Sequence, residues 1–129
     1  MARFKIIKKS QAKIVDLGTK IIRKYASSDR KLEINHMKIT GRHPENPDHF
    51  IFETKCHFMV YIISGEGYVY CDDKKFKVGA GDVIDVPVST RYAVEGDNLE
   101  YLTCEHPAWF AEQASIVDSK GIMIEDTKK

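Results

Sequence analysis

A continuous apolar run from Phe58 to Ile63 constrains the fold of this chain more than any other stretch. Its residues are mostly β-branched or aromatic, and the run is too short for a typical helix. It ends at a turn sequence that contains two glycines, Ser64-Gly65-Glu66-Gly67. Such a run, bounded by turn residues, predicts a strand that is buried on both faces.

Three further short strands are predicted directly after this run. Residues 68–71 form the first, and a pair of aspartates turns the chain into the second, 74–78, where apolar residues alternate with lysines. Residues 79–82, which include two glycines, turn the chain again into the third, 83–86. Four strands in about thirty residues indicate an antiparallel barrel or sandwich.

Strands are also predicted on either side of this centre. Residues 4–8 suggest an edge strand and 19–25 a second strand, and 91–94 and 99–104 follow the centre. The loop 41–48 is the longest stretch without periodicity, and its two prolines exclude continuous strand pairing.

Residues 32–39 alternate between apolar and polar side chains, which predicts a half-exposed strand. Leu32, Ile34 and Ile39 define its apolar face. A slip in the alternation at His36-Met37 suggests a bulge at that point.

Length and charge limit the classes of function. The chain has 129 residues, enough for one domain, which we place at 1–113 with its core at about 32–104. A tail at 114–129 is expected to fray. Twenty basic against nineteen acidic side chains leave no broad positive field, so neither nucleic acid nor anionic lipid is expected as a partner. No apolar run is long enough to cross a membrane.

The cysteines and the N-terminus bear on the cellular compartment. Cys56, Cys71 and Cys104 are an odd number without paired metal spacing. The N-terminus alternates lysine with isoleucine and lacks the apolar segment of a signal peptide. Both observations favour a cytoplasmic protein with free, mostly buried thiols.

Two glycine-containing segments carry a family resemblance. Ser64-Gly65-Glu66-Gly67-Tyr68-Val69, followed by Gly81-Asp82-Val83-Ile84-Asp85-Val86-Pro87, resembles the turn sequences of the cupin superfamily. The resemblance covers about residues 32–104, and the ending 104–113 is similar to the tail of short single-domain cupins. It implies an all-β fold of the RmlC-like kind. That fold is a double-stranded β-helix or jelly-roll barrel around a pocket, with N-terminal strands and a short C-terminal extension.

The first metal motif of the family places a histidine pair and a glutamate ahead of the Gly-x-Gly turn. Counting back from Gly65 puts the glutamate position at Phe58. With the two spacings of the family, the histidine positions fall either on Phe52 and Thr54 or on Ile51 and Glu53.

The second metal motif is also degenerate. Pro87 keeps its position, whereas Ser89 replaces a glycine and Tyr92 replaces the histidine. Among the family's ligand positions only Glu53 offers a metal ligand, so the resemblance predicts a barrel without a metal cofactor.

The same register predicts a ligand pocket. Phe58 and Tyr92 point into the barrel, with Val60, Ile62 and Glu53 around them. Walls of this kind suit a small organic ligand of sugar or carboxylate type. The Tyr92 hydroxyl is predicted to anchor the ligand or to act as a general acid. The alternative is a core tyrosine whose hydroxyl is satisfied, for example by Glu53.

Other functions stay open at this level. A metal-independent sugar isomerase or epimerase would use Tyr92 as acid and His49 as base, although the usual His-Asp pair and phosphate-binding arginines are not found. A metallo-cupin with rearranged ligands would use His49, Glu53 and His57, and a purely structural domain is the remaining alternative. Cys56 is expected to be a structural thiol, because His57 points to the opposite face of a strand.

The outer face of the central run needs cover. If every second residue fills the barrel, Met59, Tyr61 and Ile63 lie outside. Cover can come from the N-terminal strands or from a second subunit, and we predict a two-fold symmetric homodimer. His43 is interpreted as a loop histidine, with closure of the barrel mouth as the alternative, and Trp109 as part of a closing segment.

Overall fold

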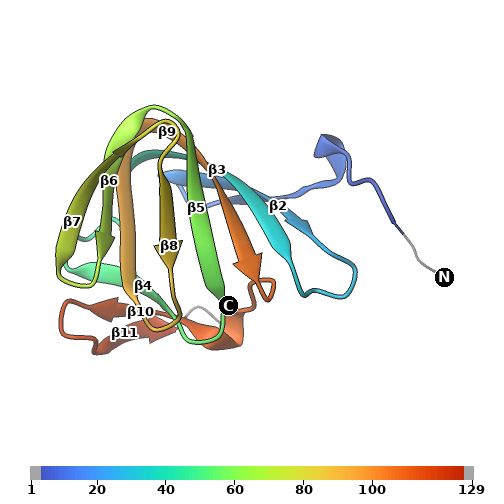
Figure 1. Cartoon of the computed structure of the whole chain (residues 1–129). Coiled ribbons are helices and arrows are strands. Elements are labelled where there is room, and N and C mark those ends of the chain that lie inside the picture. The colour runs from blue at the N-terminus through green and yellow to red at the C-terminus, as the bar shows by residue number, and fades with distance from the viewer. Residues whose placement is uncertain (1–3, 127–129) are drawn as a thin grey trace.

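The structure, a computed structural model, describes residues 4–126. In that range eleven β-strands are accompanied by two single-turn 3₁₀-helices, η1 (Lys9–Gln11) and η2 (Ala111–Gln113) (Figure 1). The strands are β1 (Lys13–Asp16), β2 (Lys20–Ala26), β3 (Glu33–His43), β4 (His49–Glu53), β5 (His57–Ser64), β6 (Glu66–Cys71), β7 (Lys74–Gly79), β8 (Val83–Val86), β9 (Arg91–His106), β10 (Ala114–Asp118) and β11 (Met123–Asp126). None of the helices in the described residues is long and apolar enough to span a membrane.

Strand β9 organises the barrel. It pairs with β3 and β4 along one side and with β5 and β6 along the other. The sheet order is β1-β2-β3-β9-β4-β10-β11, and the pairs β5–β8 and β6–β7 are attached through β9. All pairs are antiparallel, and the sheet curls around a common interior (Figure 1). The prediction of an all-β barrel is confirmed.

The two glycines between β5 and β6 are required for different reasons. Gly65 has a φ of +89°, in the left-handed region that side chains disfavour. At Gly67 a Cβ atom would collide with the carbonyl oxygen of Glu95, because β6 passes close to β9 there. A turn and a close approach of two strands therefore explain the Gly-x-Gly sequence.

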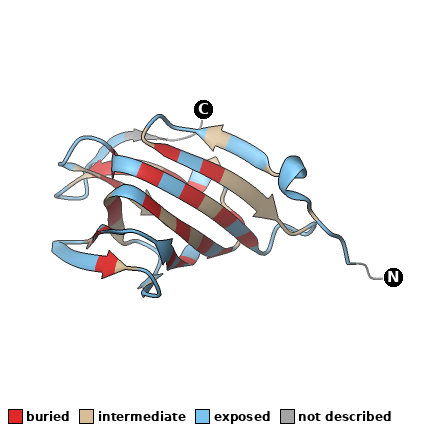
Figure 2. Ribbon diagram, turned by 90° about the horizontal axis from the view of Figure 1, so that it is seen from above, coloured by how far each residue is buried: buried red, intermediate tan, exposed pale blue. Residues whose placement is uncertain are grey.

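Strand β5 is covered on one face. Phe58, Val60 and Ile62 are buried, whereas Met59 and Tyr61 are 47% and 48% exposed. Figure 2 shows the same alternation as bands of buried and exposed residues along the strands. The prediction of a strand buried on both faces is wrong for the single chain, because β1 and β2 extend the sheet beyond β3 instead of covering β5.

The first part of strand β3 has the opposite phase from the one predicted, whereas Ile39 is buried as expected. Leu32 and Ile34 are 62% and 49% exposed, while Glu33 and Asn35 are buried. Asn35 lies opposite Thr103 of β9, which also faces the interior. The interior positions at this end of the strand are polar, so the apolar residues did not mark the buried face.

Three local predictions are wrong. Residues 4–8 form no strand, and the bulge predicted at His36-Met37 lies between Ile39 and Thr40. The predicted tail forms β10 and β11 up to residue 126, because β10 pairs with the free edge of β4. That pairing is a non-local contact which the tail's own sequence does not reveal. Residues 127–129 lie outside the described part of the chain.

The interior of the barrel holds an apolar core and, at one end, a polar cluster. The core includes Ile39, Val60, Ile62, Val69, Val78, Val86, Val94 and Leu99. The polar cluster consists of the buried residues Glu33, Asn35, Glu53, Thr103, Glu105 and Gln113. The segment from His106 to Gln113 closes this end: Trp109 donates its backbone N–H to Glu33, and Ala108 is buried.

Candidate functional site

The polar cluster arises where β3 and β9 face each other. Glu33 lies opposite Glu105 and Asn35 opposite Thr103 in the register of the two strands. Directly opposed residues of an antiparallel pair project to the same face, so all of these side chains enter the barrel together. Glu53 joins them from the end of β4.

Glu33 is a satisfied carboxylate. Its Oε1 accepts hydrogen bonds from Lys24 Nζ at 3.2 Å, from Asn35 Nδ2 at 3.2 Å and from the backbone N–H of Trp109 at 3.3 Å. Lys24 also lies over the Trp109 ring at 5.4 Å. Glu33 therefore links the closing segment to the barrel. Within the same cluster it is the example of a buried carboxylate whose charge is paired.

Glu105 is only partly satisfied. Its Oε2 accepts from Asn35 Nδ2 at 2.5 Å and from Thr103 Oγ1 at 3.5 Å, whereas its Oε1 has no hydrogen-bond partner in the described residues. Burial, followed by the nearby carboxyls of Glu53 and Glu33, raises the pKa of Glu105 to about 8. Near neutral pH this group is therefore present in both protonation states.

Glu53 behaves in the same way. Its Oε1 accepts from Gln113 Nε2 at 3.2 Å, and burial raises its pKa to about 7 against the opposing effects of Gln113 and Lys20. A carboxyl with a pKa near the working pH can both give and take a proton.

Two phenols lie beside these carboxyls. The Tyr92 ring packs edge-on against Phe58 with centroids 5.3 Å apart. Burial raises the pKa of both Tyr92 and Tyr101 well above the ordinary phenol range, so each keeps its proton. Neither hydroxyl has a hydrogen-bond partner in the described residues. The suggestion that Glu53 satisfies the Tyr92 hydroxyl is wrong.

Four buried polar atoms around this interior are thus unpaired: Tyr92 Oη, Tyr101 Oη, Asn35 Oδ1 and Glu105 Oε1. An unpaired buried polar group costs about 1–3 kcal/mol, and most buried polar groups in proteins are paired. Their concentration at one end of the barrel makes this end the candidate site.

A basic side of the site comes from β2 and β3. Lys20 is buried, and its Nζ lies 6.0 Å from the centroid of the Tyr101 ring. Burial lowers the pKa of Lys20 to about 8, although Glu53 and Glu105 oppose this effect. His43 pairs with the buried Val94 and so faces the interior. Burial and the charges of Lys20 and Arg42 lower the pKa of His43 to about 3, which leaves a neutral imidazole.

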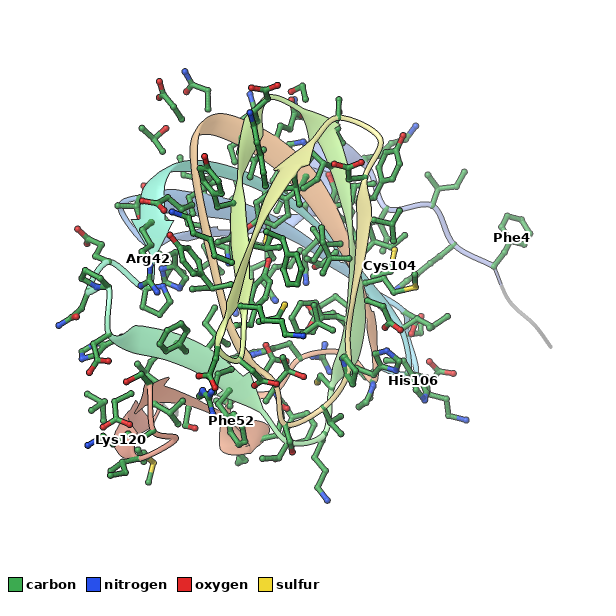
Figure 3. The ribbon with its side chains drawn as sticks, turned by 60° about the vertical axis from the view of Figure 1, so that its left-hand side comes forward. Phe4, Arg42, Phe52, Cys104, His106 and Lys120 are labelled. Carbon is green, nitrogen blue, oxygen red and sulfur yellow. The ribbon has the colours of Figure 1, made fainter. Side chains whose placement is uncertain are left out.

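The loop after His43 is held by Arg42. Its Nη1 donates to the carbonyl oxygens of Pro44, Asn46 and His49, and its guanidinium lies 5.2 and 5.0 Å from the ring centroids of Phe50 and Tyr70 (Figure 3). The loop therefore has a defined position beside the barrel.

All five predicted ligand-binding residues, Glu53, Phe58, Val60, Ile62 and Tyr92, are buried on interior-facing positions. Their role in binding stays a prediction. His49 begins β4, two residues from Ile51, which pairs with Tyr92. The pairing of Tyr92 with His49 as acid and base likewise stays a prediction.

The three residues predicted as rearranged metal ligands, His49, Glu53 and His57, are not brought together. His57 Nε2 bonds to Asp85 Oδ1 at 2.5 Å on the outer face of β5. His49 is four positions from Glu53 on one strand, a span of roughly 13 Å. The sequence reading missed Lys20, Asn35, Tyr101 and Glu105. For Asn35, Tyr101 and Glu105 the signal was the alternation of 33–39 and 99–105, in which the residues that face inward turn from apolar to polar toward one end. Lys20 lies outside these stretches, on β2.

Another group of possible metal ligands exists in the described residues. Ligand atoms of Glu53, Cys56 and Glu105 all lie within 4.8 Å of one another. The fit to a metal is poor, because burial and the two carboxyls raise the pKa of Cys56 to about 12 and the Lys20 ammonium already opposes the carboxylate charge. At the family's own ligand positions, Phe58 has no donor atom and Tyr92 keeps its proton. The donor set present does not match a cupin metal centre.

Two surface hollows lie elsewhere. They run between the N-terminal segment and strands β2 and β3, along residues such as Lys5, Ile7 and Tyr25. They share only Glu33 with the polar cluster. The candidate site is therefore defined by its buried polar atoms.

Relatives of the chain were found mainly through structure. No family model matches the sequence. The uncharacterized protein MJ1618 of Methanocaldococcus jannaschii is 33% identical over 63 residues, which cover 46% of this chain and 50% of that protein. The chain thus spans about half the length of this curated relative.

Solved structures share most of the fold. Streptomyces Pac13, described as a nucleoside dehydratase, matches 91% of this chain and 92% of its own with a TM-score of 0.78 and 20% identity. A tyrosine-to-phenylalanine variant of Pac13 with uridine matches 92% of this chain and 93% of its own, with the same TM-score and identity. An RmlC-like cupin from Shewanella frigidimarina matches 84% of this chain and 93% of its own, with a TM-score of 0.63 and 17% identity.

These likenesses, together with the curled antiparallel sheet around a closed interior, define a cupin-type barrel. The chain therefore has the cupin-type barrel fold that its turn sequences predicted. At these identities the likeness establishes the fold and leaves the activity to the site itself.

Proposed function

We propose that the barrel interior binds a small polar organic molecule of sugar, nucleoside or carboxylate type and transfers protons to and from it without a metal. The observation that carries this proposal is the group of four unpaired buried polar atoms at one end of the barrel. They comprise two phenol donors and two oxygen acceptors. A ligand rich in hydroxyl groups can satisfy both kinds at once.

The protonation states support acid–base chemistry. Glu53 and Glu105, with pKa values of about 7 and 8, can each act as acid or as base near neutral pH. Tyr92 and the neutral His43 add a hydrogen-bond donor and a hydrogen-bond acceptor on other strands. Isomerisation, epimerisation and dehydration of a sugar-like molecule all consist of such proton transfers.

The likeness to Pac13 supports the same class of ligand. That protein is described as a nucleoside dehydratase and has been solved with uridine. A shared barrel of this kind makes nucleosides a rational first set of compounds to test.

The test is a ligand screen by NMR and thermal unfolding with uridine, other nucleosides, monosaccharides and small carboxylates. We expect a binding compound to shift the backbone signals of β3, β4 and β9 near Asn35, Glu53 and Glu105. Glu105→Gln should weaken that binding, whereas Glu100→Gln, on the outer face of the same strand, should not. Binding that shifts only surface residues and is equal in both variants would contradict the proposal.

A rearranged metal site is the second candidate function, favoured by the Glu53, Cys56 and Glu105 group. We expect protein purified without added metal to contain far less than one transition metal per chain. Elemental analysis that finds a stoichiometric metal, retained against chelators and lost in Cys56→Ser, would replace the metal-free proposal with this one.

A further inference from the structure

Lys20 is the most unusual charged group of the interior. Its side chain is 4% exposed, and within the described residues no hydrogen bond or ion pair holds its ammonium. Its Nζ lies 6.0 Å from the centroid of the Tyr101 ring. Fully buried lysines are rare in proteins unless they are paired.

Lys24 lies four residues further along β2 and shows how the charge of such a lysine is ordinarily paired. Its ammonium forms an ion pair with Glu33 at 3.2 Å. Lys20 has two carboxyls within electrostatic range, Glu53 and Glu105, and bonds to neither of them. A lysine kept solely for charge balance would be expected to make the contact that Lys24 makes.

We propose that the amine of Lys20 forms an imine with the carbonyl carbon of an aldehyde or ketone ligand held in the barrel. The inference rests on the proposed function, because it names the substrate class of the same site. A desolvated amine against an aromatic wall is the environment in which lysine becomes a nucleophile, and neighbouring carboxyls can supply the protons that the chemistry needs.

The chemistry needs only groups that are present. The neutral Nζ of Lys20 attacks the carbonyl carbon, and one proton passes from nitrogen to oxygen to give a carbinolamine. The carboxylic acid of Glu105 then protonates the hydroxyl group, which leaves as water while the nitrogen lone pair forms the C=N bond. The products are an iminium ion, one water and the Glu105 carboxylate, and hydrolysis reverses each step.

The iminium connects this step with proton transfer. It withdraws electrons from the neighbouring carbon, so that a carboxylate such as Glu53 can take a proton from that carbon. The electrons of the C–H bond then form the C=C bond of an enamine, and the nitrogen becomes neutral. If the next carbon carries a hydroxyl group, the enamine nitrogen supplies the electrons that break its C–O bond, and the proton now on Glu53 leaves with the oxygen as water. The product is an unsaturated iminium ion, which hydrolysis releases from Lys20.

Burial makes the neutral amine of Lys20 accessible, because it lowers the pKa of the side chain to about 8. Glu53 on β4 and Glu105 on β9 oppose this effect and favour the ammonium, whereas Lys24 on β2 adds to it. His43 on β3 is neutral, and Arg42 beside it carries a further positive charge. At pH 8 the neutral fraction of Lys20 should exceed that of an ordinary exposed lysine by roughly a hundredfold.

The experiment is reductive trapping with sodium cyanoborohydride. The full-length protein is incubated with glycolaldehyde, glyceraldehyde or pyruvate from pH 6 to pH 9, and the modified lysines are located by peptide mass spectrometry. We expect one adduct per chain at Lys20 before other lysines react, with a rate that rises to a plateau above about pH 8. Exposed Lys38 is the internal reference.

Two variants separate covalent chemistry from charge balance. Lys20→Arg keeps the positive charge and should lose the adduct, whereas Lys38→Arg should keep it; a folded NMR spectrum confirms that each variant is intact. Adducts spread over surface lysines without preference for Lys20 would overturn the proposal. If uridine or a sugar still shifts the NMR signals of the interior residues in that case, the imine proposal fails while the proposed function stands. The failure of one can therefore be told from the failure of the other.

Discussion

The apolar core and the polar cluster lie in one barrel and share many of the same strands, yet they have opposite effects on the stability of the fold. On β9, Val94 and Leu99 are completely buried among apolar neighbours, whereas Thr103 and Glu105 enter the polar cluster. The alternation of the strand is the same in both regions. Only the residue type at the inward positions differs.

The energetic consequences are opposite. Each buried aliphatic side chain of the core stabilises the fold by about 1.5–3 kcal/mol. The polar cluster instead holds two carboxyls whose pKa values are raised by burial, and four polar atoms in it and beside it have no hydrogen-bond partner within the described residues. A structure that keeps such groups inside gives up stability there, which is the pattern expected of a binding or catalytic site.

Removing a core side chain should have the largest effect. Ile62→Ala deletes a completely buried side chain of β5 and should lower the free energy of unfolding by about 2–5 kcal/mol. Ile63→Ala, on the partly exposed face of the same strand, should cost clearly less. Urea unfolding of both variants is the measurement, and equal losses would mean that the two faces of β5 are equally packed in solution.

Replacing a carboxyl of the polar cluster should change stability in the other direction. The pKa of Glu105 is about 8 in the folded protein against an ordinary value near 4.5, so the native state binds more protons than the unfolded state between these values. Its contribution is fully present below pH 4.5 and is lost as the pH rises to about 8. Glu105→Gln should therefore be more stable than the wild type at pH 8, by about 3–5 kcal/mol, and similar to it at pH 4.5.

The control for this prediction lies on the outer face of β9. His36 lowers the pKa of Glu100 through a 2.5 Å contact, so this carboxylate stabilises the fold above its unfolded pKa and loses that contribution as the pH falls. Glu100→Gln should show the opposite sign at pH 8. Differences between each variant and the wild type cancel the titration of His43, whereas Lys20 is coupled to Glu105 and contributes to the measured difference for Glu105→Gln. Parallel pH profiles for the wild type and Glu105→Gln would contradict the buried-carboxyl argument.

Sequence patterns predicted the core far better than the cluster. The run from Phe58 to Ile63 and the Gly-x-Gly turn identified β5, its inward residues and the barrel. At the start of β3 the apolar residues Leu32 and Ile34 predict the inward-facing side, and this prediction puts Glu33 and Asn35 on the wrong face. An apolar side chain marks the buried face of a strand reliably only where the interior beside it is apolar. At the candidate site the interior is polar, so this pattern fails there.

The predicted tail failed for a different reason. Strand β10 exists because β4 offers it a free edge, and Val117 packs with Phe50 and Ala93 against the outside of the barrel. Neither partner is near it in the chain, so no local pattern marks the strand.

A single hydroxyl inside the site should affect binding more than stability. Tyr92→Phe removes an unpaired oxygen and almost no volume, so the free energy of unfolding should change by less than about 1 kcal/mol or rise slightly. A ligand at about a hundred times its Kd adds roughly 2.7 kcal/mol to the wild type. That gain should shrink in Tyr92→Phe and persist in Tyr61→Phe, on the exposed face of β5. An unchanged melting shift in Tyr92→Phe would show that the hydroxyl does not anchor the ligand.

The smallest effect on the stability of the single chain is expected on the outer face of β5. Met59 and Tyr61 lie beside Val83 of β8 and Leu102 of β9, so apolar side chains continue across three strands without cover from the described chain. We expect a second copy to cover this face in a two-fold homodimer, since such a surface is usually buried by a partner. Tyr61→Lys should then yield a folded monomer by light scattering, with little change in its own unfolding free energy. Phe76→Lys, at a similarly exposed apolar position on β7, should stay dimeric. If the wild-type protein is a monomer at micromolar concentration, no partner is needed to cover this face. The difference between the two faces of β5 would then reflect only the packing within a single chain.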